Sequence, residues 1–273
     1  MAHIQLNFYS NALKKNANVI VFIPTVSADD YLMGGSVRYG QKGLKYQTLY
    51  LLHGSYGDYL DWSRFTGIER YAQDKVLAVV MPSGENSGYV NMAFGEAYET
   101  YLTKELPEFM EKMFPVAKKR ENTFIGGLSM GGYGAFHCAL KCPERYGCAV
   151  SLSGALDMQM LQNSRVPHIT NMSLNYRKAV YKDFNKIRGS DADIFYLLEE
   201  AVKGRKDLPK LYMACGQEDF IFEENENFYN KAEKLSVSVE YIRDHGIHEW
   251  DYWDVHIRMA LDWLPCKKDL VEE

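Results

Sequence analysis

Ser129 lies in the densest glycine cluster of the chain, within the segment "FIGGLSMGGYGAF" at residues 124–136. Gly127, Ser129 and Gly131 form the pattern G-x-S-x-G, which joins an apolar run to a stretch of helix-forming residues. In a strand-to-helix turn of this kind, only glycine fits where the two elements crowd together, and the serine hydroxyl is pushed out of the sheet edge. The spacing therefore predicts a nucleophilic serine at the start of a helix.

A serine hydroxyl is a poor nucleophile at neutral pH and needs a histidine base that is oriented by a carboxylate. Two histidines, His245 and His248, follow the last predicted strand in the segment "RDHGIHEWDYW". Gly246 breaks the chain between them and leaves His248 on a loop directly before a predicted helix. The sequence favours His248 as the base and keeps His245 as the alternative.

The carboxylate is expected after the penultimate strand, because a loop at that position can reach a histidine that follows the last strand. The segment "ACGQEDF", residues 214–220, ends a predicted strand with a turn and offers Glu218 and Asp219. We expect Asp219 to be the acid, with Asp157 as the alternative.

Acyl transfer also needs N–H donors for the developing oxyanion. The N–H of Met130 lies at the start of a helix, where the helix dipole favours negative charge. The second donor is expected from "LLHGSYGD", residues 51–58, which leaves an earlier strand. Because Gly54 carries no side chain, the Ser55 N–H can point at the reacting carbon, and the N–H of Gly54 is the alternative.

Four aromatic residues flank this predicted centre and are candidates for substrate binding: Tyr56, Trp62, Tyr133 and Trp250. Aromatic walls shape a short pocket and can stack on a sugar or phenyl ring. For Trp62 and Trp250, packing at the bases of the loops is an equally good interpretation.

The elements that must position these residues alternate along the chain. Short apolar, β-branched runs predict strands at residues 18–24, 47–54, 76–82, 122–129, 147–154, 210–216 and 238–244. Amphipathic stretches predict helices at residues 64–73, 96–114, 131–140, 223–235 and 251–264. This alternation predicts one α/β domain over residues 1–273, with a mostly parallel sheet covered on both faces.

Residues 156–208 interrupt this alternation, because a simple crossover between two strands needs far fewer residues. We expect this insertion to form a lid over the site. Inert decoration of the fold is the alternative.

The composition excludes several classes of partner and site. The formal net charge is −5 and no block of like charges stands out, so neither nucleic acid nor a membrane surface is an expected partner. The five cysteines are odd in number and lack metal-ligand spacing, which indicates reduced thiols and no metal. The first 24 residues lack the order of a signal peptide, so we expect a cytoplasmic protein.

The segments "LLHGSYGDYLDW", "GLSMGGYGAF", "CGQEDF" and "HGIHEWDYW" resemble, in order and spacing, the esterase D group of α/β hydrolases. The resemblance runs from about Val19 to Leu264 and is to the branch of tributyrin esterases and carbohydrate acetyl or feruloyl esterases. Related S-formylglutathione hydrolases would show "GHSMGGHGA", whereas Leu128 and Tyr133 replace both histidines here. Dienelactone hydrolases would carry a cysteine in place of Ser129.

This resemblance implies an α/β-hydrolase fold, the triad of Ser129, Asp219 and His248, and Ser55 and Met130 as oxyanion donors. It implies a serine carboxylesterase that acts on small-molecule, short-chain acyl esters through an acyl-enzyme, without a cofactor or metal. The alternatives are an acyltransferase that uses a sugar hydroxyl, a thioesterase like S-formylglutathione hydrolase, and a non-catalytic protein on the same scaffold. A homo-oligomer is compatible with this prediction.

Overall fold

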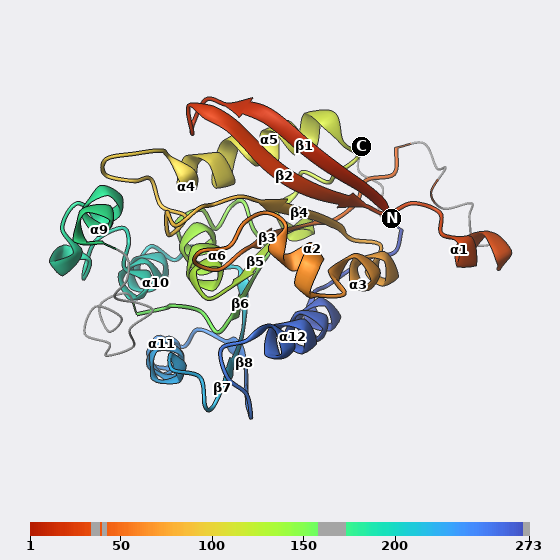
Figure 1. Ribbon diagram of the computed structural model, residues 1–273. Helices are drawn as coiled ribbons and strands as arrows, with labels where there is room; N and C mark the ends of the chain where they lie inside the picture. The colour runs from red at the N-terminus through yellow and green to blue at the C-terminus, as the bar shows by residue number, and fades with distance from the viewer. Residues whose placement is uncertain (34–38, 40–42, 158–172, 270–273) are drawn as a thin grey trace.

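The computed structural model describes residues 1–33, 39, 43–157 and 173–269. Its centre is an eight-stranded sheet in the order β1-β2-β4-β3-β5-β6-β7-β8 (Figure 1). The strands are β1 Ala2–Ser10, β2 Lys15–Ile23, β3 Thr48–Leu52, β4 Ala78–Pro82, β5 Thr123–Leu128, β6 Cys148–Leu152, β7 Lys210–Gly216 and β8 Val239–Asp244. The strands from β4 to β8 in this order pair in parallel, whereas β1 and β2 are antiparallel to their neighbours.

Helices lie on both faces of this sheet, as predicted (Figure 1). The α-helices are α1 Ala28–Leu32, α2 Asp61–Phe65, α3 Ile68–Lys75, α4 Tyr98–Thr100, α5 Leu106–Met113, α6 Met130–Lys141, α9 Leu174–Tyr181, α10 Ile194–Lys203, α11 Phe222–Lys234 and α12 Trp250–Trp263. The described residues also contain a π-helix, η2 Tyr101–Glu105, and the 3₁₀ turns η3 Arg120–Asn122 and η4 Phe184–Lys186. Within these residues, no helix is both long enough and apolar enough to cross a bilayer.

The central strands are buried on both faces, and their alternating side chains enter two different cores. In β3, Leu49 and Leu51 pack with α3 and α12, whereas Tyr50 and Leu52 pack with α5, α6, α10 and α11. This explains the continuous apolar runs in the sequence, since a strand covered on both sides has no polar face.

Three details differ from the sequence prediction. The first strand, β1, was not predicted; it is an edge strand whose burial alternates along its length, so it forms no apolar run. The predicted helix at 64–73 is two helices, because Thr66 is extended and its hydroxyl donates to the Trp62 carbonyl at 2.6 Å. The predicted helix at 96–114 is divided into α4, η2 and α5 by the change to π-helical hydrogen bonding.

The described helices of the predicted insertion at 156–208 lie in two different places. Helix α10 packs against α6 and buries Ile194, Leu198 and Ala201 in the core, so it belongs to the body of the domain. Helix α9 and η4 lie beside the cavity described at the candidate site, and residues 158–172 lie outside the described part of the chain.

Parallel pairing brings the carboxyl ends of the central strands to one edge of the sheet. Leu52 of β3 pairs with Gly127 of β5, and Gly216 of β7 pairs with Asp244 of β8. The loops that follow these four strands therefore meet, and they carry the residues that the sequence singled out.

Candidate active site

Ser129 stands in a tight turn between β5 and α6, with a left-handed φ of 52°. A side chain at Gly131 would place its Cβ 2.6 Å from the backbone oxygen of His53, and one at Gly127 would place it 2.5 Å from the Gly131 backbone. Such distances are impossible for real side chains, which explains the glycines of the motif. The strained serine backbone costs about 1–3 kcal/mol and is held by the surrounding strands.

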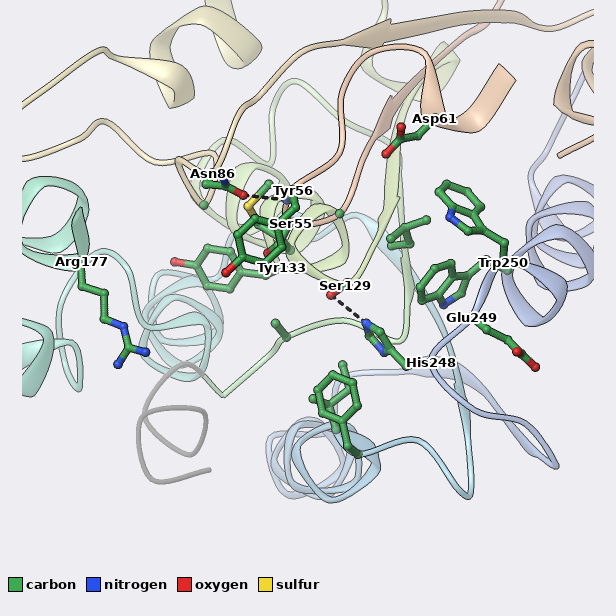
Figure 2. Close-up of a pocket in the computed structure, with 18 of the residues that line it drawn as sticks. Ser55, Tyr56, Asp61, Asn86, Ser129, Tyr133, Arg177, His248, Glu249 and Trp250 are labelled. Atoms are coloured by element: carbon green, nitrogen blue, oxygen red, sulfur yellow. Dashed lines mark hydrogen bonds between the residues drawn. The ribbon is translucent and has the colours of Figure 1, made fainter. Parts of the chain in front are cut away.

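The three predicted triad residues meet at the sheet edge, and Figure 2 shows Ser129 and His248 facing each other. The Ser129 Oγ lies 3.0 Å from His248 Nε2, and His248 Nδ1 lies 2.9 and 3.1 Å from the two carboxylate oxygens of Asp219. The Asp219 side chain is completely buried, and its Oδ1 also accepts the Ile221 N–H at 3.1 Å. A carboxylate can only accept hydrogen bonds, so Nδ1 carries a proton and Nε2 is left to accept the serine hydroxyl.

The alternative base and acid lie elsewhere. His245 is exposed and pairs with Glu218 at 2.9 Å, on the outside of the loop. Asp157 is buried and forms an ion pair with Arg188 at 2.5 Å. The hydrogen bonds of the His248 ring go to Ser129 and Asp219 instead.

The two predicted oxyanion donors, the backbone amides of Met130 and Ser55, have no protein acceptor among the described residues. Met130 is the first residue of α6, so its N–H is one of the donors that a helix leaves unpaired. The next amide along the loop that follows β3, that of Tyr56, is already used, because it donates to Asn86 Oδ1 at 2.7 Å. The Gly54 N–H, the alternative donor, also has no protein acceptor among the described residues, so Ser55 stays the predicted donor of that loop.

Ser129 opens into a cavity of about 600 Å³, which is within the size range of small-molecule sites. One side of this cavity carries Trp250, Glu249 and Asp61, and the other carries Asn86 and Arg177 (Figure 2). Most of the lining is apolar. Burial raises the pKa of the Asp61 carboxyl above its usual range.

Three of the four predicted substrate-binding aromatics line this cavity: Tyr56, Tyr133 and Trp250. Trp62 does not. Its side chain is 1% exposed, its indole N–H donates to the Leu52 carbonyl at 2.9 Å, and its ring packs edge-on against Trp250. The contact expected between Trp62 and substrate is therefore corrected to a packing role behind Trp250.

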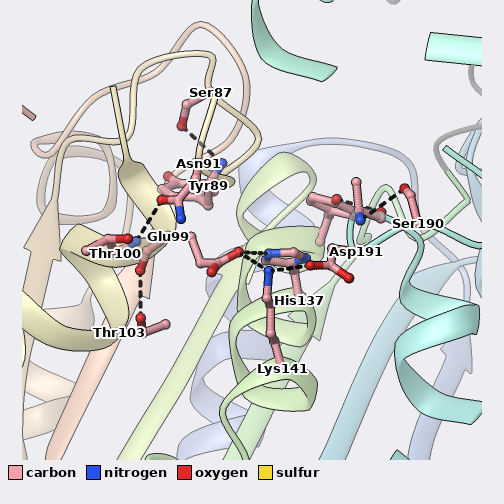
Figure 3. Close-up of polar contacts among 12 residues, drawn as sticks. Ser87, Tyr89, Asn91, Glu99, Thr100, Thr103, His137, Lys141, Ser190 and Asp191 are labelled. Carbon is pink, nitrogen blue, oxygen red and sulfur yellow. Dashed lines mark hydrogen bonds and ion pairs between the residues drawn. The ribbon is translucent and has the colours of Figure 1, made fainter. Parts of the chain in front are cut away.

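Tyr133 belongs to α6, and polar contacts between α6 and neighbouring segments hold it in place. Its hydroxyl donates to the Ala192 carbonyl at 2.8 Å and its ring stacks on His137. His137 contacts Glu99 at 2.8 Å, and Lys141 joins Glu99 to Asp191 (Figure 3).

This network fixes the charge of Glu99 and the wall of the cavity. Burial alone would raise the pKa of the Glu99 carboxyl, but the hydrogen bonds from His137 and Lys141 outweigh it and lower the pKa to about 2. Through these bonds, α6 is tied both to α4 and to the segment before α10.

The sequence prediction missed Asn86 and the role of His53. Both belong to loops that follow neighbouring strands, β4 and β3, whose carboxyl ends meet at the same edge. The polar stretch "SGENSGY" at 83–89, directly after an apolar strand, is the signal that could have pointed to Asn86. His53 is not a base for Ser129: its Nε2 accepts the Gly84 N–H at 2.8 Å.

All five cysteines are free. Burial raises the pKa of each thiol, to about 11 for Cys148 and Cys266 and well above the usual value for Cys138. In the described part of the chain, no three His, Cys, Asp or Glu side chains are placed to hold a metal ion.

Comparison with known proteins gives consistent matches. The Esterase family model matches residues 10–264. The chain is 38% identical over 271 residues to an acetyl esterase of Caldicellulosiruptor saccharolyticus, a match that spans 98% of this chain and 100% of that protein.

Two solved structures from Staphylococcus aureus have similar chains. FphF, a fluorophosphonate-binding serine hydrolase, matches with a TM-score of 0.86 at 32% identity, and the S-formylglutathione hydrolase FrmB with 0.82 at 32%. Each match spans 96% of this chain and 98% of the other. The predicted α/β-hydrolase fold is confirmed by these matches.

Proposed function

This chain belongs to the Esterase family, as its resemblance to the esterase D group predicted, and is a serine esterase; from this premise we propose that it hydrolyses short-chain carboxylic esters through an acyl-enzyme on Ser129. The observation that carries the proposal is the 3.0 Å contact between Ser129 and a histidine whose other nitrogen is held by buried Asp219. The amides of Ser55 and Met130, which have no protein acceptor among the described residues, support the proposal as candidate oxyanion donors.

In the first half-reaction, the Ser129 Oγ attacks the ester carbonyl carbon while its proton moves to His248 Nε2. The carbonyl electrons move to the oxygen, which the N–H groups of Ser55 and Met130 stabilise. Asp219 stabilises the imidazolium and keeps it in place without taking its proton. The tetrahedral intermediate collapses, the bond to the alcohol oxygen breaks, and His248 returns the proton to the leaving alcohol.

In the second half-reaction, water takes the place of the alcohol. The water oxygen attacks the acyl carbon while His248 Nε2 accepts a proton from the water. The N–H groups of Ser55 and Met130 stabilise the new oxyanion. Collapse of this intermediate releases the carboxylic acid and returns the proton to Ser129.

The alcohol and acyl groups are proposed from the cavity and the relatives. A cavity of about 600 Å³ with Tyr133 and Trp250 in its walls suits an acetyl or butyryl group joined to a ring. The match to a protein named acetyl esterase supports acetyl as the acyl group. We propose short acetylated xylo-oligosaccharides as the physiological substrates, ahead of feruloylated sugars.

A series of p-nitrophenyl esters tests the acyl group. We expect high kcat/KM for acetate and butyrate and a sharp fall beyond about eight acyl carbons, as the chain outgrows the cavity. A value that keeps rising to palmitate would contradict the short cavity and indicate a lipase-like site.

Acetylated xylo-oligosaccharides and S-formylglutathione, assayed side by side, test the alcohol group. We expect faster release of acetate from the sugars. Faster hydrolysis of S-formylglutathione would favour the thioesterase alternative, and an acylated sugar product in place of free acetate would favour the acyltransferase.

A further inference from the structure

The oxyanion loop, residues 53–57, carries the predicted donor, the Ser55 N–H. Its backbone has a conformation that an isolated loop would not adopt. Tyr56 has a left-handed φ of 65°, although it is not glycine, and the residue is 64% exposed. Such a backbone persists only where its surroundings fix it. Bonds from elsewhere must therefore hold the loop.

The peptide unit that contains the Ser55 N–H is fixed through its carbonyl. In a planar trans peptide, the Gly54 C=O and the Ser55 N–H point in opposite directions. The Gly54 oxygen accepts the Gly57 N–H at 3.3 Å and lies 2.7 Å from His53 Nδ1. Because His53 Nε2 accepts the Gly84 N–H, Nδ1 carries the proton and donates to Gly54.

The next peptide unit is fixed by Asn86. Its side-chain oxygen accepts the Tyr56 N–H at 2.7 Å, across thirty residues of sequence, and it lines the same cavity as Ser55 and Ser129 (Figure 2). With both neighbouring peptides held, the backbone of Ser55 has little freedom to turn its own N–H away from the reacting centre.

We propose that Asn86 is a positioning residue of the esterase reaction, which fixes the left-handed Tyr56 and thereby aims the Ser55 N–H at the oxyanion. The inference rests on the proposed acyl-enzyme mechanism. A neutral amide suits this task, because a carboxylate could accept the same N–H but would place a negative charge beside a developing negative charge.

The loop that carries Asn86 does not depend on the Asn86 side chain for its own shape. The Ser87 hydroxyl donates to the Gly84 carbonyl at 2.7 Å and accepts the Tyr89 N–H at 3.0 Å, and the Tyr89 hydroxyl donates to the His53 carbonyl at 2.9 Å. Removal of the Asn86 amide should therefore release the oxyanion loop and leave the loop at 84–89 folded.

The first test is Asn86→Ala, assayed with p-nitrophenyl acetate. We expect kcat to fall about 10- to 100-fold with KM nearly unchanged, since the lost interaction acts in the transition state. Affinity for phenylboronic acid, which forms a tetrahedral adduct with serine, should fall by a similar factor. An unchanged kcat, or a change confined to KM, would overturn the proposal.

The second variant separates the hydrogen bond from the charge. Asn86→Asp keeps an acceptor for the Tyr56 N–H and should keep the wild-type Tm, yet its kcat should be as low as that of Asn86→Ala or lower. Wild-type kcat in Asn86→Asp would show that the amide is not chosen for the oxyanion, and would contradict the proposal.

Asn91→Ala is the matched control. Asn91 Oδ1 accepts the Thr100 N–H at 3.0 Å, so it makes the same kind of bond from the same region, but it does not line the cavity (Figure 3). Its loss should lower Tm as Asn86→Ala does and leave kcat unchanged. An equal loss of kcat in both variants would indicate general loosening and overturn the specific role.

Ser129→Ala keeps the two proposals distinguishable. If Ser129→Ala retains activity, the proposed mechanism fails, whatever Asn86 does. If Ser129→Ala is inactive and Asn86→Ala has wild-type kcat, only the positioning role fails.

Discussion

The two amides that flank Ser129 are held in different ways. In the turn between β5 and α6, residues 127–131, here called the elbow, the Ser129 N–H donates to the Leu152 carbonyl at 2.9 Å. The Ser129 carbonyl accepts the N–H groups of Tyr133 and Ala155, each at 3.1 Å. These are all backbone bonds, to β6, to the loop that follows it and to α6. The Met130 N–H is thus aimed by the fold itself.

The oxyanion loop depends instead on side chains. Asn86 accepts the Tyr56 N–H, and His53 joins the loop to Gly84. A single substitution can remove either bond without a change in the sheet. The comparison indicates that backbone hydrogen bonds keep the elbow rigid, whereas the conformation of the oxyanion loop depends on side chains that a substitution can change.

The largest expected effect concerns the catalytic triad, which both the elbow and the oxyanion loop serve. Ser129→Ala and His248→Ala should each lower kcat by a factor on the order of 10⁴ to 10⁶, because the triad acts as a unit. The double variant should be scarcely worse than either single variant in steady-state assays. Additive losses would show that the two side chains do not cooperate.

A pair of glycine substitutions sharpens the comparison directly. Gly131→Ala would push a Cβ against the His53 backbone oxygen, and we expect a loss of about 2–3 kcal/mol in the free energy of unfolding. The elbow would also shift, which should lower kcat about a hundredfold. Urea unfolding measures the free energy of unfolding, and p-nitrophenyl acetate turnover measures kcat.

Gly54→Ala is the partner of that experiment in the oxyanion loop. Its Cβ would lie 2.6 Å from Leu128 Cδ1, the end of a flexible side chain that can move aside. We expect a loss of about 1 kcal/mol or less. If Gly54→Ala were as damaging as Gly131→Ala, the two halves of the site would be equally rigid and the comparison would fail.

The oxyanion loop should also be the half that responds to pH, through His53. Burial lowers the pKa of this imidazole, which outweighs the opposing effects of the Gly54 backbone, Asp58 and Glu85. The unfolded chain binds the proton more readily than the folded one, so His53 lowers stability as pH falls below its unfolded value of about 6.5. The neutral form also matches its role as acceptor of the Gly84 N–H.

His53→Gln removes this titration and keeps an acceptor. At about pH 7.5 the variant should lose about 1 kcal/mol of unfolding free energy, and the gap to wild type should narrow at about pH 5.5. Denaturant unfolding at the two pH values measures the difference in unfolding free energy between wild type and variant. Other groups titrate alike in both proteins, so their contribution cancels in this difference. A gap that is equal at both values would count against a buried, neutral His53.

The smallest effect is expected at the cysteines. Since burial raises the pKa of their thiols, Cys→Ser at Cys138, Cys142, Cys148 or Cys215 should change Tm and leave kcat intact. Inhibition of the folded enzyme by a mild thiol reagent would contradict this expectation.

The difference between the two halves also explains what the sequence could predict. The elbow is local: Gly127, Ser129 and Gly131 lie within five residues, so their spacing carries the geometry. Asp219 and His248 follow the last two strands of a parallel sheet, and chain order alone brings such loops together. The strands of the central sheet were predicted for a similar reason, since burial on both faces leaves continuous apolar runs.

The missed features depend on tertiary contacts. Asn86 meets Tyr56 only because β3 and β4 are neighbours, and nothing in its local sequence shows that its side chain turns toward another loop. Trp62 lies close to the site in sequence, but its indole N–H binds Leu52 and turns the ring into the core. Strand β1 pairs at an edge, where half of its side chains are exposed and its apolar signal is weak.

The central claim, an acyl-enzyme on Ser129, is tested most directly by trapping that intermediate. Enzyme mixed with p-nitrophenyl acetate, quenched in acid within the first turnover and digested, should carry one acetyl group on the peptide that contains Ser129. The same peptide from Ser129→Ala should be unlabelled. An acetyl group on another residue of the wild-type enzyme, with turnover that survives in Ser129→Ala, would contradict the account.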